Sequence, residues 1–293
     1  MTLEQLRIFV AVAEREHVTR AAEALGITQS AVSGAIATLE ARHNAKLFHR
    51  VGRGIELTDA GRFFLGEARV VLARAAEAEL ALSEFGELKR GCLRLVASQT
   101  IASYWLPERL AAFHARYPLV ELSVAIANTE GAARSVRDGD TELGFIEGSI
   151  DDGSLACWQV GGDRMLLVDR EPASAVTNDW LLAARWIIRE EGSGTRSTLE
   201  RAMRDRGIDP ARLNIALTLP SNEAVLAAVR VGAGCALLSQ LVVAPALQQG
   251  ALCVLPLELP ARPFLALRQK ERYRSKAADA LLDVFTAHEA GSR

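Results

Sequence analysis

The sequence predicts an α+β multidomain protein with three parts, and three observations support this prediction. The chain has 293 residues, about twice the length of a typical single domain. Its first part has apolar residues at helical spacing, and a stretch from residue 59 to about 88 contains no proline. Beyond residue 90, short apolar runs alternate with helical stretches. We therefore expect an N-terminal helical domain (1–58), a linker helix (59–90) and a C-terminal two-lobed α/β domain (91–293).

The composition is that of a folded globular protein. Apolar residues make up 49% and charged residues 24%, and the formal net charge is −2. No apolar run approaches the roughly 20 residues that span a bilayer, and the start lacks the pattern of a signal peptide. We therefore expect a cytoplasmic protein without a membrane partner. The four cysteines form no C-x-x-C pair and the five histidines have no metal-ligand spacing, so we expect reduced thiols, no metal site and no cofactor.

The first 58 residues have the element order of a winged helix-turn-helix. A first amphipathic helix is followed by a second, which we expect Thr19 to cap and Gly26 to end. Thr28 is placed to cap a third helix. Two short strands, 47–48 and 55–57, are expected around the turn formed by residues 52–54.

The third helix and the wing carry side chains suited to DNA. Gln can hydrogen-bond adenine, and Ser or Thr can bond bases or phosphates, so its small polar face suits the major groove. Residues 41–55 contain four basic side chains and no acidic one, which indicates phosphate or minor-groove contacts. A small helical domain with an ordinary polar surface is the alternative. The candidate residues for contacts with a double-stranded DNA operator are Thr19, Arg20, Thr28, Gln29, Ser30, Ser33, Thr38, Arg50 and Arg53.

The linker stretch predicts one long helix with an apolar stripe. Thr58 is placed to cap it, and 30 helical residues span about 45 Å. Its apolar residues alternate at spacings of four and three, which is a heptad pattern typical of helix pairing. We expect a homodimer through this helix, with packing against its own chain as the alternative. The residues expected in the dimer seam are Phe64, Val71, Ala78, Leu82 and Phe85.

The C-terminal part predicts parallel sheet with crossover helices. The expected strands are 92–97, 120–127, 143–147, 165–169, 186–189, 213–218, 236–238 and 264–268. The most evident helices are 106–117, 197–206, 223–231 and 277–288. One lobe would comprise about 91–163 and 266–293, and the other about 164–265.

Hydroxyl and amide side chains gather at strand-to-helix junctions of this part. Helix N-termini present free N–H groups and partial positive charge, and ligands of open α/β sheets bind at the carboxyl ends of strands. These features predict a site for a small anionic effector, such as a carboxylate, an amino-acid derivative or a sulfur oxyanion. Ordinary helix capping is the alternative for each residue. The candidates are Ser98, Gln99, Thr100, Asn128, Thr129, Glu147, Ser193, Gly194, Thr195, Ser221, Asn222 and Glu223.

With these residues laid out, the chain resembles the LysR-type transcriptional regulators over almost its full length. The N-terminal motifs that carry the resemblance are Leu3 to Phe9, Arg20 to Leu25, Thr28 to Ser33, Leu39-Glu40, Leu47-Phe48, Arg50 and Leu57 to Gly61. The C-terminal motifs are Gly91 to Leu95, Arg116 to Pro118, Glu142 to Phe145 and Gly232 to Leu238. The stretch from Ala97 to Ile101, with Asn128-Thr129 and Glu147-Gly148, is more similar to the branches linked to sulfur metabolism and carbon fixation.

The resemblance implies a type-II periplasmic-binding-protein architecture, with two lobes joined by crossing strands and the effector in the cleft. It further implies a homotetramer built as a dimer of dimers, and RNA polymerase as a partner. Two positions depart from the family pattern. Gly34 stands where many relatives have a larger side chain on the recognition helix, and His43-Asn44 replaces a frequent turn glycine. Both departures leave DNA binding expected, but they bear on which operator sequence the protein recognises.

Other functions are less consistent with the sequence. It contains no G-x-S-x-G, P-loop, Rossmann G-x-G-x-x-G or H-E-x-x-H motif, so we do not expect an enzyme. A periplasmic solute-binding protein would share the C-terminal fold but has no use for residues 2–58. A regulator whose C-terminal half serves only assembly is the remaining alternative.

Overall fold

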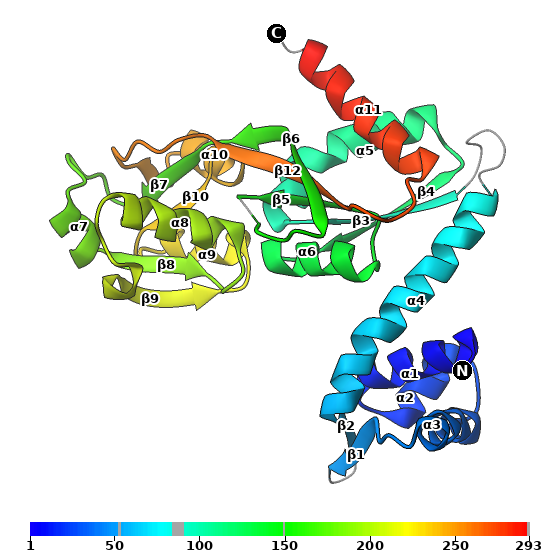
Figure 1. Ribbon diagram of the computed structural model, residues 1–293. Helices are drawn as coiled ribbons and strands as arrows, with labels where there is room; N and C mark the ends of the chain where they lie inside the picture. The colour runs from blue at the N-terminus through cyan, green and yellow to red at the C-terminus, as the bar shows by residue number, and fades with distance from the viewer. Residues whose placement is uncertain (52–53, 84–90, 149, 292–293) are drawn as a thin grey trace. The chain divides into compact units, whose positions relative to one another are not determined.

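The computed structural model in Figure 1 describes residues 1–291 except 52–53, 84–90 and 149. The chain divides into two compact units. The first comprises Met1–Gly86 with Asp138–Asp140, and the second comprises Glu87–Arg137 and Thr141–Arg293. Among the described helices, none is both long enough and apolar enough to cross a membrane.

The first unit is a winged helix-turn-helix followed by a long helix, as predicted. Its elements are α1 (Leu3–Arg15), α2 (Val18–Leu25), α3 (Gln29–His43), β1 (Phe48–Val51), β2 (Gly54–Leu57) and α4 (Asp59–Ser83). The strands β1 and β2 pair antiparallel from Phe48 opposite Leu57 to Val51 opposite Gly54. The core contains Phe9, which is fully buried between the rings of Phe48 and Phe64 at centroid distances of 5.5 and 4.9 Å.

The helix starts agree with two of the three predicted caps. Thr28 Oγ1 accepts a hydrogen bond from the Ala31 N–H at 3.2 Å, and Thr58 Oγ1 accepts one from the Gly61 N–H at 2.9 Å. The predicted cap at Thr19 is wrong. The helix α2 begins one residue earlier, at Val18, and His17 takes the cap position in extended conformation, with its Nδ1 accepting from the Arg20 N–H. An imidazole nitrogen can accept the capping hydrogen bond in place of a hydroxyl.

The seam predicted on α4 divides into two halves. Phe64 packs against Phe9, and Ala68 is 1% exposed in the same core, so this half of the helix packs against its own domain. This is the alternative that the sequence left open for the linker helix. Val71, Ala78 and Leu82 lie further along the helix, and Val71 and Leu82 are 41% and 76% exposed. The last predicted seam residue, Phe85, lies outside the described residues.

The first lobe of the second unit is built on a five-stranded sheet with strand order β4-β3-β5-β12-β6. The strands are β3 (Gly91–Ala97), β4 (Val120–Ile126), β5 (Leu143–Glu147), β6 (Leu155–Asp163) and β12 (Arg262–Gln269). The helices are a π-helix (Ile101–Trp105), α5 (Leu106–Arg116), α6 (Thr129–Asp138) and α11 (Lys276–Gly291). Figure 1 shows α5 and α11 on one face of this sheet and α6 on the other. An aromatic cluster fills the first side: Trp105, Phe145, Phe264 and Phe285.

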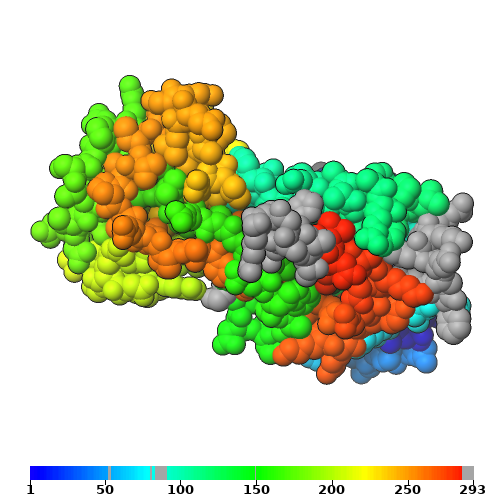
Figure 2. Space-filling model, turned by 90° about the horizontal axis from the view of Figure 1, so that it is seen from above, coloured from blue at the N-terminus to red at the C-terminus, as the bar shows by residue number. Residues whose placement is uncertain are grey.

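The second lobe contains two small sheets. The strands β7 (Met165–Asp169), β10 (Ala236–Ser239) and β11 (Cys253–Val254) form one, and β8 (Arg185–Arg189) and β9 (Asn214–Leu219) form the other. The helices are α7 (Asn178–Ala183), α8 (Gly194–Asp205), α9 (Asn222–Arg230) and α10 (Gln240–Gln248), with a 3-10 turn at Pro210–Arg212. Fully buried Trp186 anchors this core and donates from Nε1 to the Leu181 carbonyl at 2.8 Å. Figure 2 shows this lobe and the first one from above.

The prediction of parallel sheet is correct only in part. The pairs β3–β4, β3–β5 and β8–β9 are parallel, and their carboxyl ends carry the predicted junctions. By contrast, β12 runs antiparallel to β5 and β6, and β7 runs antiparallel to β10 and β11. In the first sheet, the antiparallel strand β12 is the one with which the chain returns from the second lobe. The chain leaves the first sheet after β6 and returns to it at β12.

Candidate functional site

The predicted DNA-contacting side chains lie on the surface of the first unit. Arg20, Gln29, Ser30, Ser33 and Arg50 are exposed, as are Thr28 and Thr38, while Thr19 is half-buried. Arg53 lies outside the described residues. Three of the hydroxyls are engaged locally. Thr28 caps α3 and its Oγ1 shares a hydrogen bond of 3.0 Å with Ser30 Oγ, and Thr38 Oγ1 donates to the Gly34 carbonyl at 2.7 Å. The amide and basic side chains therefore offer more specific contacts than these two threonines.

A groove of about 310 Å³ brings three parts of this surface together. It is lined by Thr19 at the start of α2, Gln29 at the start of α3, and Arg50 on the wing. The wing is fixed there because the Ile55 N–H donates to the Glu16 carbonyl at 3.4 Å. Two helix starts and an arginine at one groove are features that suit a phosphate group, next to the exposed polar face of α3.

Glu40, at the end of the third helix, was not recognised as structural from the sequence. It is 8% exposed, and its Oε1 accepts from the N–H groups of Leu47 and Phe48 at 2.8 and 3.3 Å. Its Oε2 accepts from Lys46 Nζ at 2.7 Å. Burial raises the pKa of Glu40, but the hydrogen bonds from Lys46 and the two backbone groups outweigh burial and leave the pKa lowered. This carboxylate therefore attaches β1 of the wing to α3.

We expect Glu40→Gln to destabilise the first unit by about 1.5–3 kcal/mol at neutral pH, because hydrogen bonds to a charged acceptor are lost. A lowered pKa means that the contribution is fully present above the unfolded value of 4.5 and disappears as pH falls through the folded value. Urea unfolding at several pH values measures the difference. The exposed Glu23→Gln, which removes a carboxylate from α2, is the control. A difference that persists at low pH would contradict this role of the charge.

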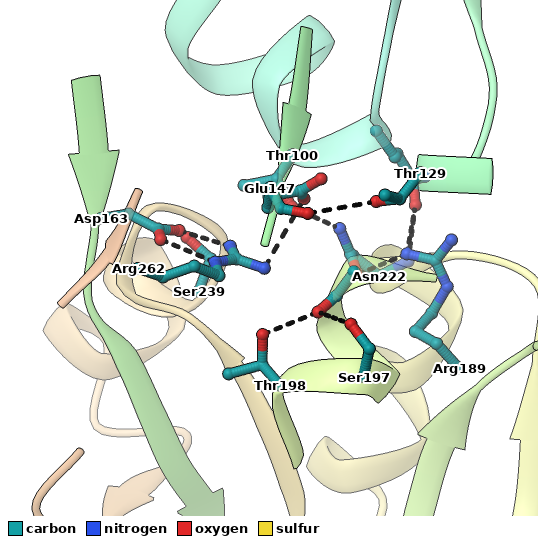
Figure 3. A network of polar contacts seen from close by, with 12 residues as sticks. Thr100, Thr129, Glu147, Asp163, Arg189, Ser197, Thr198, Asn222, Ser239 and Arg262 are labelled. Atoms are coloured by element: carbon teal, nitrogen blue, oxygen red, sulfur yellow. Dashed lines mark hydrogen bonds and ion pairs between the residues drawn. The ribbon is translucent and has the colours of Figure 1, made fainter. Parts of the chain in front are cut away.

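In the second unit, the junctions after β3 and β9 meet between the lobes, and Figure 3 shows part of the resulting network. Asn222 is 1% exposed, and its Nδ2 donates to Thr100 Oγ1 at 3.0 Å. Gln99 Oε1 accepts from the Asn222 N–H at 2.8 Å. Gln99 Nε2 and Tyr104 Oη both donate to the Glu223 carboxylate. Burial and this carboxylate raise the pKa of Tyr104.

The junctions after β4 and β8 meet in the same way. Asn128 Nδ2 donates to the Glu191 carbonyl at 3.1 Å, and the Glu130 N–H donates to the Gly192 carbonyl at 3.3 Å. Thr129 Oγ1 donates to the Glu147 carbonyl at 3.3 Å within the first lobe. A pocket of about 470 Å³ opens here, lined among others by Thr129 and Ser193.

Two buried arginines of this region were not predicted from the sequence. Arg189 is 5% exposed; it forms a two-point ion pair with Glu190 and donates from Nη1 to Asn222 Oδ1 at 2.6 Å. Arg262 is 3% exposed and donates to both carboxylate oxygens of Asp163 at 2.8 and 2.6 Å. The available signal was a charged residue at the end of an apolar strand, because such a residue is buried only with a partner.

The remaining predicted effector residues differ in burial and in whether their side chains cap a helix. Ser221 Oγ accepts from the Ala224 N–H at 3.0 Å, which is a helix cap. Ser193 precedes α8 without capping it through its side chain, and Gly194 and Thr195 begin that helix and are buried. Ser98 and Glu147 are each 3% exposed. The candidate residues thus lie at junctions that meet one another, and at least one of them caps a helix.

In the described part of the chain, the cysteines form no disulfide and the possible metal ligands form no cluster. The four cysteines are free, and burial, together with Asp169, raises the pKa of Cys235 to about 12. No group of three or more His, Cys, Asp or Glu side chains in these ranges is arranged to hold a metal ion.

A winged helix-turn-helix joined to a two-lobed α/β domain defines a ligand-sensing DNA-binding regulator, and comparison with known proteins identifies its family. Residues 3–62 match the profile for bacterial regulatory helix-turn-helix proteins of the lysR family, and residues 86–290 match the LysR substrate binding domain. The chain belongs to the LysR family of transcriptional regulators.

Individual relatives and structures are similar over nearly the whole chain. The regulator CbbR of Rhodospirillum rubrum is 33% identical, over 97% of this chain and 96% of that protein. The regulator YeiE of Escherichia coli K12 is 32% identical, with the same coverage. The structure of full-length CbnR complexed with its target DNA covers 98% of this chain and 99% of that one, with a TM-score of 0.68 and 21% identity. A full-length OxyR variant from Pseudomonas aeruginosa covers 97% and 94%, with a TM-score of 0.69 and 21% identity.

Proposed function

We propose that this regulator binds an operator sequence through residues 1–58 and responds to a small effector that carries an anionic group, bound between the two lobes of residues 91–293. The effector part of this proposal rests on one observation. Hydroxyl and amide side chains from separate junctions contact each other, above all Thr100 Oγ1 and Asn222 Nδ2 at 3.0 Å. Buried polar groups at strand ends and helix starts suit an anionic ligand.

The effector acts by changing how the lobes close. In the closed arrangement, Asn222 of one lobe donates to Gln99 Oε1 and to Thr100 Oγ1 of the other. A ligand that binds these groups must have different affinities for the open and closed arrangements, and this difference shifts the population between them. The change in lobe closure then alters operator binding or activation, with RNA polymerase as the proposed further partner.

We assign self-association to the exposed half of α4 within residues 59–90. Val71 and Leu82 are 41% and 76% exposed although they are apolar, and they lie on the predicted heptad stripe with Ala78. A second copy of the helix would bury them and would place two recognition helices on one operator. Two further exposed apolar strips, on the edge strands β4 and β9, are candidates for the additional contacts of a homotetramer: Val124, Ile126, Ile215 and Leu217.

The DNA assignment predicts different effects for two substitutions. Gln29→Ala is expected to reduce the preference for the operator over nonspecific DNA by about 1–3 kcal/mol, because an amide that pairs with a base edge is removed. Arg50→Ala is expected to weaken binding to all sequences and to reduce the salt dependence by about one phosphate contact. Fluorescence anisotropy on the DNA upstream of the gene, at several salt concentrations with competitor, measures both effects.

Arg212→Ala is the matched control, because it removes the same charge from an exposed position in the second unit. Normal affinity of both the Gln29 and Arg50 variants would refute the assigned interface. A folded protein that binds neither this fragment nor any fragment of a genomic library would refute DNA recognition as such. If DNA binds but no small molecule stabilises the protein or changes its affinity, the C-terminal half serves assembly alone.

A further inference from the structure

Within the described residues, three buried polar atoms beside the cleft have no hydrogen-bond partner: Ser98 Oγ, Glu147 Oε2 and Arg262 Nη1. Each belongs to a side chain that is 3% exposed. Ser98 follows β3, Glu147 ends the neighbouring strand β5, and Arg262 begins β12, which pairs with β5. Because an unsatisfied buried polar group costs about 1–3 kcal/mol, three at adjacent strand ends indicate a missing partner.

The charges at this place do not balance. Arg262 is the partner of two carboxylates, and Asp163 takes its two-point hydrogen bonds at 2.8 and 2.6 Å. Glu147 Oε1 lies 3.7 Å from Arg262 Nη1 and receives no hydrogen bond from it. Figure 3 shows the three side chains in one row. A second buried arginine, Arg189, is matched by Glu190. By formal charge, the group of Arg262, Asp163 and Glu147 has one negative charge in excess, and Glu147 Oε2 lacks a hydrogen-bond donor, which a cationic donor group would supply.

A pocket on the other side of Thr129 also has more acidic than basic side chains in its lining. Thr129, which donates to the Glu147 carbonyl, lines this pocket of about 470 Å³. Its charged lining consists of one basic side chain and four acidic ones: Arg196, Glu130, Asp151, Glu191 and Glu200. Such a surface attracts cationic groups and opposes the approach of a simple oxyanion.

We propose that the effector is a zwitterion, a free amino acid or a close analogue, whose ammonium group donates to Glu147 Oε2. Its carboxylate accepts from Arg262 Nη1 and from the hydroxyl of Ser98. An α-amino acid carries both groups on one carbon, which suits a donor and an acceptor on side chains that lie 3.7 Å apart. Sulfate at neutral pH has no proton to donate to Glu147 Oε2. This inference rests on the effector site proposed above and specifies its ligand class.

The experiment measures binding to the full-length protein by thermal shift, followed by calorimetry for the compounds that stabilise it. The panel contains the proteinogenic amino acids, their α-hydroxy-acid counterparts, the decarboxylated amines, sulfate and phosphate. We expect stabilisation by at least one amino acid and none by its hydroxy acid or amine. Glu147→Gln is expected to weaken this binding about tenfold or more, since it removes a charged acceptor. The exposed Glu258→Gln is the matched control and is expected to bind normally.

Ser98→Ala provides a second variant in case Glu147→Gln does not fold, because it removes a hydroxyl that has no partner in the protein. It is expected to fold and to weaken amino-acid binding about threefold or more. Amino-acid binding that both variants leave unchanged would overturn the proposal. So would stabilisation by oxyanions or hydroxy acids alone, although an effector site would then still exist. Operator binding without stabilisation by any amino acid would also overturn it, whereas loss of operator binding would count against the proposed function instead.

Discussion

Gly61→Ala is expected to destabilise the first unit by about 1–3 kcal/mol, the range for an overpacked core. A Cβ atom at this position would lie 2.1 Å from the Leu47 carbonyl oxygen and 2.8 Å from Leu57 Cδ2. One of these contacts is with backbone, so α4 must shift away from the wing to relieve it. The hydrogen bond from the Gly61 N–H to Thr58 Oγ1, which starts α4, would be strained by the same shift.

Gly66→Ala on the same helix is the matched control. Nothing lies within 4 Å of a Cβ atom there, so alanine is expected to stabilise the helix by about 0.5–1 kcal/mol. Urea unfolding of both variants at one fixed protein concentration measures the contrast, because association also contributes to stability. Equal effects of the two substitutions would show that α4 is not closely packed on the wing.

Gly194→Ala is expected to weaken the closed arrangement of the lobes by about 1–3 kcal/mol. At this first residue of α8, a Cβ atom would lie 2.7 Å from both the Glu147 carbonyl oxygen and Thr129 Oγ1. These atoms belong to the opposite lobe, so the conflict is relieved when the lobes separate. Amide hydrogen exchange of the segments around Thr100 and Asn222 is expected to accelerate about fivefold or more, since about 1.4 kcal/mol is a factor of ten.

Gly153→Ala is the control for this effect, because no atom lies within 4 Å of its Cβ position. Exchange in the core strand β5 should stay at the wild-type rate in both variants, which distinguishes separation of the lobes from general destabilisation. Wild-type exchange around Asn222 in Gly194→Ala would show that this close approach does not control closure.

The sequence predicted the order of the elements better than their pairing. Helical periodicity and caps such as Thr28 and Thr58 are local features, and both caps were correct. The strand β6 was missed because Gly161 and Gly162 resemble a turn in the sequence. In the structure, a Cβ atom at Gly161 would lie 2.9 Å from the Trp105 ring and one at Gly162 would lie 2.8 Å from the Arg262 carbonyl. These glycines allow close packing inside a strand, and only the tertiary structure shows that packing.

The residues of the candidate cleft were predictable where they lie between the end of a strand and the start of a helix. Thr100 and Asn222 each follow a parallel strand, and the geometry of parallel sheets brings such ends together. The pairing of Arg262 with Asp163 was not predictable, because it depends on the register of two antiparallel strands nearly a hundred residues apart in the chain. The start of α8 was placed three residues late, since its small residues, including Gly194, carry no helical periodicity.

The ion pair of Arg262 and Asp163 also has a mechanical consequence. The two residues face each other on β12 and β6, at the points where the chain passes from one lobe to the other. Under the proposal above, a ligand on Arg262 Nη1 would act directly on the two strands that connect the lobes. A change in how these strands pair would displace the second lobe as a whole, whereas a ligand on the lobe's outer surface has no such access to the connection.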